Sequence, residues 1–190
     1  MKKFLFLFIF LIICLHSRSF ADGDNYFISL YVGRATDKDF QELAVFEYEK
    51  YIESKIIVVS LGKEIYDHKD LFNLEIEGQV GKHWEYQHHW EINVVLSVRW
   101  NKFPWDDYLD TSFAIGDGFS YAFADPEIEV DDMGRTSKLL NYLLLEWSFS
   151  VFEPHWSVFS RIHHRSGIYG LINNVSGGSN MVTGGIRYSF

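Results

Sequence analysis

The feature that most constrains the fold of this chain is a repeated alternation of apolar and polar side chains. The alternation is almost unbroken over residues 71–82, and from residue 89 to 101 its apolar face begins and ends with a tryptophan, Trp90 and Trp100. Successive side chains of a β-strand point to opposite faces, so a two-residue period predicts strands with one apolar and one polar face. Apolar faces closed by aromatic side chains are typical of strands that cross a membrane.

The same alternation recurs in about eight segments, the smallest number that is usual for an outer-membrane barrel. Besides the two segments above, they cover residues 26–34, 55–65, 112–121 and 138–152, and a C-terminal pair within residues 156–190. The sequence therefore predicts an all-β fold, an eight-stranded antiparallel transmembrane up-and-down β-barrel.

A soluble β-sandwich would also alternate, and the charges on the polar faces favour a barrel instead. Ionisable side chains are rarely buried unless they are paired, and a small barrel interior is filled by its own side chains. We therefore expect an internal ion-pair network rather than a pore. Its expected members are Glu75, Glu77, Glu91, Arg99, Glu146, Arg161, His163, Arg165 and Arg187.

Composition agrees with a β-rich membrane protein. Aromatic residues make up 18% of the chain, with 17 Phe, 11 Tyr and 6 Trp. The formal net charge of -9 argues against a protein that binds nucleic acid, because such proteins carry a basic stripe.

The N-terminus has the layout of a secretory signal peptide. Lys2 and Lys3 precede an apolar run, and small residues at a cleavage site follow it, so we expect residues 1–21 to be removed. Residues 22–190 then form one barrel domain in the outer membrane. Cys14, the only cysteine, lies in the signal, so the mature chain offers no disulfide and no cysteine-based metal site.

The lengths of the connections predict the orientation of the barrel. With both termini in the periplasm, the short turns at residues 66–70 and 153–155 face the periplasm, and the longer connections 37–54 and 122–137 lie outside. The second contains an acidic run, residues 125–132, which we interpret as a solvated loop, with a divalent-cation site as the alternative. Adjacent histidines on a strand face opposite sides, so we interpret His88 and His89 as loop or belt residues rather than as a metal site.

The candidate chemistry lies on the strand that ends at Ser166. His164 and Ser166 are two residues apart on an otherwise apolar face, where lipid contact has no routine use for an imidazole and a hydroxyl. A serine nucleophile needs a base within reach and a group that orients this base. On the same face of the next strand, Asn180 can hold the imidazole tautomer, although a neutral amide in place of a carboxylate can cost on the order of 10⁴ in turnover.

Residues 161–166, the turn 177–180 and the ending 186–190 resemble the lipid A 3-O-deacylase (PagL-like, acyloxyacyl hydrolase) family of outer-membrane barrels. In that family a His-x-Ser on strand seven and a Glu on the last strand form a lipid-facing triad that hydrolyses an acyl ester of lipid A. His164 and Ser166 match its first two members. Asn180 stands where the Glu is expected, and Gly167 stands where the family has an Asn that helps the oxyanion hole.

The resemblance implies an esterase that acts on an outer-leaflet lipid without a cofactor. Ser166 would attack the ester, His164 would carry the proton, Asn180 would orient His164, and Gly167 with Asn173 or Asn174 would offer oxyanion donors. The terminal Phe190 after alternating apolar residues is also typical of the signal that the barrel assembly machinery reads.

Two alternatives to the esterase stay open. The missing carboxylate favours a non-catalytic barrel that serves as an envelope scaffold or binds a lipid or another partner. A weaker alternative is an enzyme that uses the inward-facing pair Glu146 and His163, although a filled interior leaves little room for a substrate.

Overall fold

The structure is a computed structural model, and it describes residues 25–37, 40–44, 51–69, 71–152 and 155–190. The expected signal peptide, residues 1–21, lies outside the described residues. Within these ranges, no helix is both long and apolar enough to cross a bilayer.

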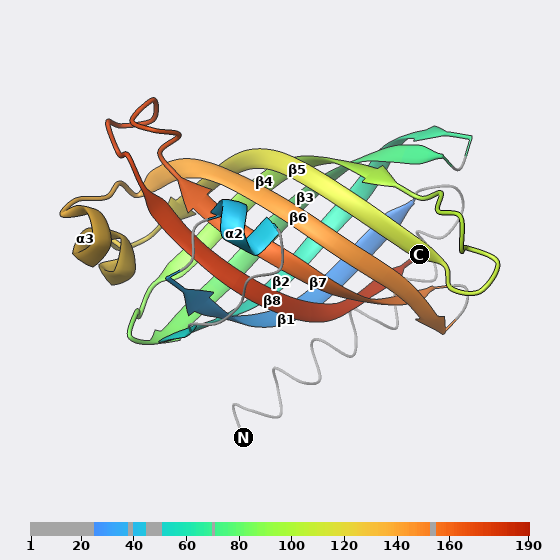
Figure 1. Ribbon diagram of the computed structural model, residues 1–190, viewed down its shortest axis with the longest axis horizontal. Coiled ribbons are helices and arrows are strands. Elements are labelled where there is room, and N and C mark those ends of the chain that lie inside the picture. The colour runs from blue at the N-terminus through green and yellow to red at the C-terminus, as the bar shows by residue number, and fades with distance from the viewer. Residues whose placement is uncertain (1–24, 38–39, 45–50, 70, 153–154) are drawn as a thin grey trace, which may run out of the picture.

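Eight antiparallel strands close into a barrel in which each strand pairs with its neighbours in the sequence and β1 pairs with β8 (Figure 1). The predicted fold class is confirmed. The strands are β1 Tyr26–Thr36, β2 Tyr51–His68, β3 Phe72–Glu85, β4 Trp90–Trp100, β5 Thr111–Ala122, β6 Leu139–Phe152, β7 Trp156–Ser166 and β8 Gly178–Ser189.

The largest difference from the predicted boundaries concerns β2. This strand begins at Tyr51, not at residue 55, because the β1–β2 ladder continues past a register shift and pairs Thr36 with Tyr51. The connection expected over residues 37–54 is therefore shorter, and it contains a short helix, α2 (Phe40–Ala44), that the sequence did not predict.

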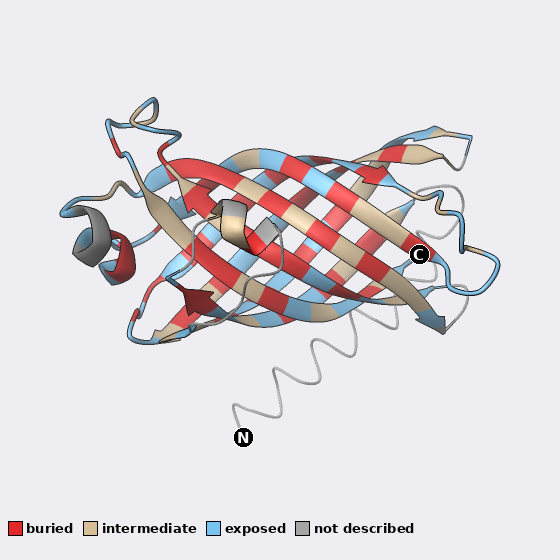
Figure 2. Ribbon diagram, in the orientation of Figure 1, coloured by how far each residue is buried: buried red, intermediate tan, exposed pale blue. Residues whose placement is uncertain are grey.

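Burial alternates over most of the wall as the sequence predicted, so buried and exposed residues form a chequered pattern (Figure 2). An exception is β7, where Arg161, Ile162 and His163 are all buried. The outer face carries exposed apolar side chains, including Leu61, Val94 and Phe119, while Glu75, Glu91 and Arg161 are buried on the inner face. A wall of this kind suits contact with lipid outside and charge pairing inside.

The buried charges form the expected ion-pair network across the interior. Arg161 binds Glu77 through two hydrogen bonds of 3.0 Å and also binds Glu146, which accepts a further hydrogen bond of 2.6 Å from Arg99. Arg99 and Arg187 share Glu75. Glu146 is thus held by arginines while His163 contacts Glu91 at 2.7 Å, so the structure does not bring Glu146 and His163 together as an acid-base pair.

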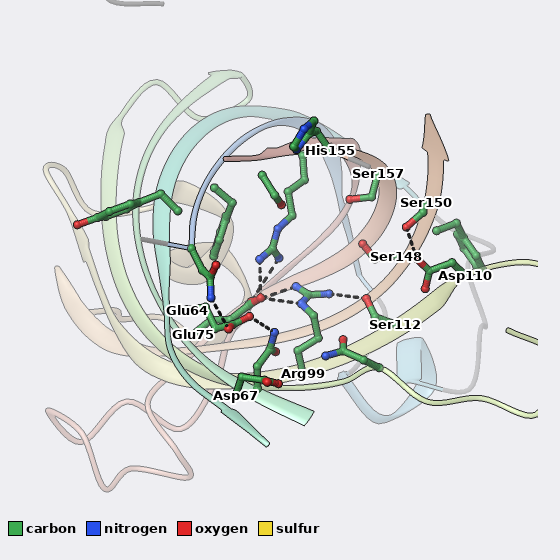
Figure 3. Close-up of a pocket in the computed structure, with 18 of the residues that line it drawn as sticks. Glu64, Asp67, Glu75, Arg99, Asp110, Ser112, Ser148, Ser150, His155 and Ser157 are labelled. Atoms are coloured by element: carbon green, nitrogen blue, oxygen red, sulfur yellow. Dashed lines mark hydrogen bonds and ion pairs between the residues drawn. The ribbon is translucent and has the colours of Figure 1, made fainter. Parts of the chain in front are cut away.

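The two ends of the barrel differ. We call the end that holds Asn25 and Phe190 the termini end, and the opposite end the loop end. At the termini end a polar cavity of about 750 Å³ opens, and the side chains of Glu64, Glu75 and Arg99 point into it (Figure 3).

A helix, α3 (Glu127–Met133), lies at the loop end and corrects the prediction of a solvated loop over the acidic run. Ile128 packs in a buried cluster with Tyr31 and Met181, and the buried Glu129 binds Arg165 at 2.9 Å. The acidic residue that the structure buries here therefore neutralises an interior arginine.

Candidate functional site

The candidate site lies on the outer wall near the loop end, where β7 and β8 pair. Ser166 is the last residue of β7, and His164 precedes it on the same outward face. Both side chains are partly buried. The β7–β8 register places His164 directly opposite Asn180.

The structure brings His164 and Asn180 together. The Nδ1 atom of His164 lies 2.6 Å from the carbonyl oxygen Oδ1 of Asn180. Because a carbonyl oxygen only accepts hydrogen bonds, Nδ1 carries the proton and Nε2 keeps its lone pair. The imidazole is thereby held in the tautomer that a general base requires.

Ser166 is less completely engaged. Within the part of the chain that the structure describes, no hydrogen bond joins Ser166 Oγ to the His164 ring. Across the β6–β7 ladder the direct neighbour of Ser166 is Asn141, whose side-chain amide donates to Asp117 Oδ1 at 2.7 Å. The hydrogen bond between a serine nucleophile and its histidine base, here Ser166 and His164, is often long or poorly aligned before a substrate binds.

Asp117 and Asn141 are polar residues of the outer wall that the sequence analysis did not single out. Asp117 is exposed between Ile115 and Phe119, which point outward with it. A carboxylate on a lipid-facing wall is costly and commonly marks a functional position. The sequence contains the pattern that identifies this position, because Asp117 is a charged residue on the otherwise apolar face of residues 113–121.

Helix α2 covers part of the site from outside. It lies against β7, and the ring of Phe40 packs 4.7 Å from the ring of His164 (Figure 1). Ile162 and Asn180 are only 7% and 9% exposed, although both point outward from the barrel. The wall at His164 is therefore covered by the protein itself.

The three predicted oxyanion donors lie in or beside the connection between β7 and β8. The N–H group of Gly167 donates to Gly177 O at 2.9 Å, and the side chain of Asn173 donates to Ser137 Oγ and Leu139 O, both at 2.9 Å. Asn174 accepts a hydrogen bond from Arg135 through its backbone oxygen. Asn173 and Asn174 have φ values of 52° and 56°, as their turn chemistry requires.

A second cluster lies inside the barrel, near the loop end. His89 lies in the connection between β3 and β4, as predicted for a loop residue, but its side chain is buried and stacks on His83, with 4.2 Å between ring centroids. Burial and the neighbouring His83 lower the pKa of His89 to about 3, so this imidazole is neutral at neutral pH. His88 is exposed, as expected.

The fold is shared with solved outer-membrane barrels. Neisserial surface protein A is similar over 89% of this chain and 100% of its own, with 12% identity and a TM-score of 0.52. The outer membrane enzyme PagL is similar over 85% of this chain and 98% of its own, with 13% identity and the same TM-score of 0.52. No protein-family model and no curated protein matches the sequence. At these identities the likeness shows the fold.

Proposed function

We propose that this protein is an outer-membrane ester hydrolase that removes an acyl chain from an outer-leaflet lipid, with lipid A as the substrate. The observation that carries the proposal is the contact of 2.6 Å between His164 Nδ1 and Asn180 Oδ1 on the outer wall, beside Ser166 on the same face. This arrangement leaves His164 Nε2 as the basic nitrogen, on the same strand face as the Ser166 hydroxyl.

In the proposed reaction, Ser166 Oγ attacks the ester carbonyl while His164 Nε2 takes the hydroxyl proton. The tetrahedral intermediate expels the lipid alcohol, which receives that proton, and an acyl-serine forms. Water, deprotonated by His164, then releases the fatty acid and restores Ser166. Asn180 fixes the tautomer of His164 but carries no negative charge to stabilise the imidazolium, so a slow enzyme is expected.

Gly167, Asn173 and Asn174 are the proposed oxyanion donors. To donate to the substrate oxygen, the Gly167 N–H group would have to leave its present acceptor, Gly177 O. The Asn173 side chain would likewise have to leave Ser137 Oγ. The connection that carries them therefore has to rearrange when a substrate binds, and an oxyanion donor of this kind can be worth roughly 10² to 10³ in rate.

The surroundings of Ser166 fit a lipid with a polar head. A polar row crosses three neighbouring strands of the otherwise apolar wall, and it consists of Asp117 on β5, Asn141 on β6, and Ser166 and His164 on β7. Acyl chains would lie along the apolar wall while the sugar and amide groups of the head meet this row. The proposal places the loop end outside the cell and requires insertion by the barrel assembly machinery.

A non-catalytic barrel is the second candidate, and the covering of the site favours it. Phe40 packs on His164, and among the described residues Ser166 Oγ has no hydrogen bond to that ring. A barrel that binds a lipid or another partner would need neither an open imidazole nor a charged orienting residue.

Mass spectrometry of lipid A tests the proposal. Outer membranes that contain the wild-type protein should lose one acyl chain, and membranes with equal amounts of Ser166→Ala should keep it. Ser160→Ala is the matched control, because Ser160 also faces outward on β7 but lies six residues from Ser166 along the strand. Identical spectra for wild type and Ser166→Ala would assign the protein to the second candidate.

A further inference from the structure

Three buried side chains meet inside the barrel near the loop end: His83 of β3, His89 of the connection that follows, and Glu91 of β4. Their potential ligand atoms all lie within 4.8 Å of one another. The backbone holds this arrangement, because His83 N–H donates to His89 O at 3.0 Å and the hairpin register places Glu91 opposite Gly81. The three residues are 3%, 3% and 0% exposed, in that order.

The cluster has unused ligand atoms. Among the described residues, neither ring nitrogen of His89 has a hydrogen-bond partner, and neither does Nδ1 of His83. A buried polar atom without a partner costs free energy, and native proteins usually satisfy it with water or an ion. Gln87, in the same connection, adds a buried side-chain oxygen that has no hydrogen-bond partner among the residues that the structure describes. The two ring nitrogens of His89 and Nδ1 of His83 are therefore available to coordinate an ion.

We propose that His83, His89 and Glu91 bind a divalent transition-metal ion, of which Zn²⁺ is the best match. Two imidazoles and one carboxylate form a ligand set that zinc uses with a fourth, exchangeable ligand. Calcium and magnesium prefer sites made of oxygen ligands, so a site with two imidazoles disfavours them. Copper and nickel also bind imidazole and compete for the same ligands.

The residues around Glu91 support its role as a ligand. His83 Nε2 contacts Glu91 Oε2 at 3.1 Å, while the other carboxylate oxygen contacts His163 Nε2 at 2.7 Å. Carboxylates that ligate a metal are commonly held by an outer-shell hydrogen bond, and a third histidine, His163, supplies one here. Arg165 lies 4.0 Å from Glu91, but it also forms an ion pair of 2.9 Å with Glu129, which offsets its charge.

Metal binding requires a small local change. Ligand atoms that share a zinc ion lie about 3.3 Å apart, as bond lengths near 2 Å and tetrahedral angles require. The rings of His83 and His89, which stack with an interplanar angle of 17°, therefore have to turn about their side-chain bonds. The bound ion would fasten the β3–β4 connection to the interior of the barrel, so it should also raise the unfolding temperature.

Titration of the full folded barrel in detergent micelles, after removal of metal by a chelator, tests the site. Zn²⁺ is followed by calorimetry and Co²⁺ by its visible absorption, which is intense when the ion is four-coordinate. We expect one ion per barrel and binding at least about tenfold weaker in His89→Ala. His88→Ala is the matched control, because His88 is the exposed neighbour of His89.

The outcomes are distinguishable. One saturable site that His88→Ala leaves intact and His89→Ala weakens supports the proposal, as does a Zn²⁺-dependent rise in unfolding temperature that His89→Ala abolishes. No saturable binding to the wild type, or binding that His88→Ala removes, overturns it. Far-ultraviolet circular dichroism verifies that each variant is folded, and His89→Asn, which keeps a polar side chain, replaces His89→Ala if that variant fails to fold.

Discussion

Asn180 accepts a hydrogen bond from His164 Nδ1 at 2.6 Å, and this contact joins β8 to β7 on the outer wall of the barrel. It gives the imidazole a fixed orientation and tautomer without giving it a counter-charge. A serine hydrolase with this arrangement has a positioned base that is poorly stabilised once it is protonated.

Asn180→Asp should therefore increase ester hydrolysis, by up to on the order of 10⁴-fold, because a carboxylate stabilises the imidazolium that forms as Ser166 is deprotonated. The measurement is the turnover of a chromogenic acyl ester by the purified barrel in micelles. The double variant Asn180→Asp, Ser166→Ala should be inactive. If Asn180→Asp is no faster than Ser166→Ala alone, His164 and Asn180 do not serve catalysis.

Phe40→Ala should expose His164 to reagents in solution. The centroids of the Phe40 and His164 rings lie 4.7 Å apart, so removal of the Phe40 ring uncovers the part of the imidazole that it packs against. The rate at which diethylpyrocarbonate modifies His164, followed by peptide mass spectrometry, should rise several-fold. The exposed His155, far along the barrel at the termini end, supplies the internal reference. An unchanged rate would mean that α2 does not control access to His164.

The alternation in the sequence was enough to predict the barrel and its interior network, because a two-residue period fixes which face each side chain of a strand occupies. His164, Ser166 and Asn180 were assigned to one outer face in the same way, and their placement in the structure follows from that periodicity. Glu77 and Arg161 pair across the barrel, and only closure of the sheet determines which buried acid meets which buried base.

Other features depend on contacts that periodicity does not contain. Helix α2 has only five residues, too few for a helical pattern, and it is held against β7 by tertiary contacts. His83 and His89 were not recognised as neighbours because their meeting depends on the length of β3, which continues to Glu85, beyond the predicted end at residue 82. Boundaries of this kind are the part of a fold that sequence patterns determine least.

Arg161→Met should destabilise the barrel by about 3–5 kcal/mol, because it leaves Glu77 and Glu146 buried with less compensating charge. Urea unfolding in lipid vesicles, followed by tryptophan fluorescence, measures the change. Arg34→Met is the control, since Arg34 is exposed, and its effect should stay within about 0.5 kcal/mol. Equal unfolding midpoints for the two variants would show that the interior network contributes no net stability.

Gly118→Ala should also destabilise the barrel, by roughly 1–3 kcal/mol, through a clash rather than a lost charge. A Cβ atom at this position would lie 2.0 Å from Val94 O and 2.8 Å from Val95 Cα, both backbone atoms of the neighbouring strand β4, which cannot move aside without breaking the ladder. Gly78→Ala is the matched control in another strand, because its nearest contact would be Leu61 O at 3.9 Å.

Both glycine variants remove the same backbone freedom from the unfolded chain, so the difference between their unfolding free energies isolates the close approach of β5 to β4. Gly78→Ala should therefore unfold at a urea concentration equal to or higher than that of the wild type, while Gly118→Ala should unfold at a lower one. If the two variants unfold at the same urea concentration, β5 and β4 must lie farther apart at Gly118 than the backbone distances there indicate.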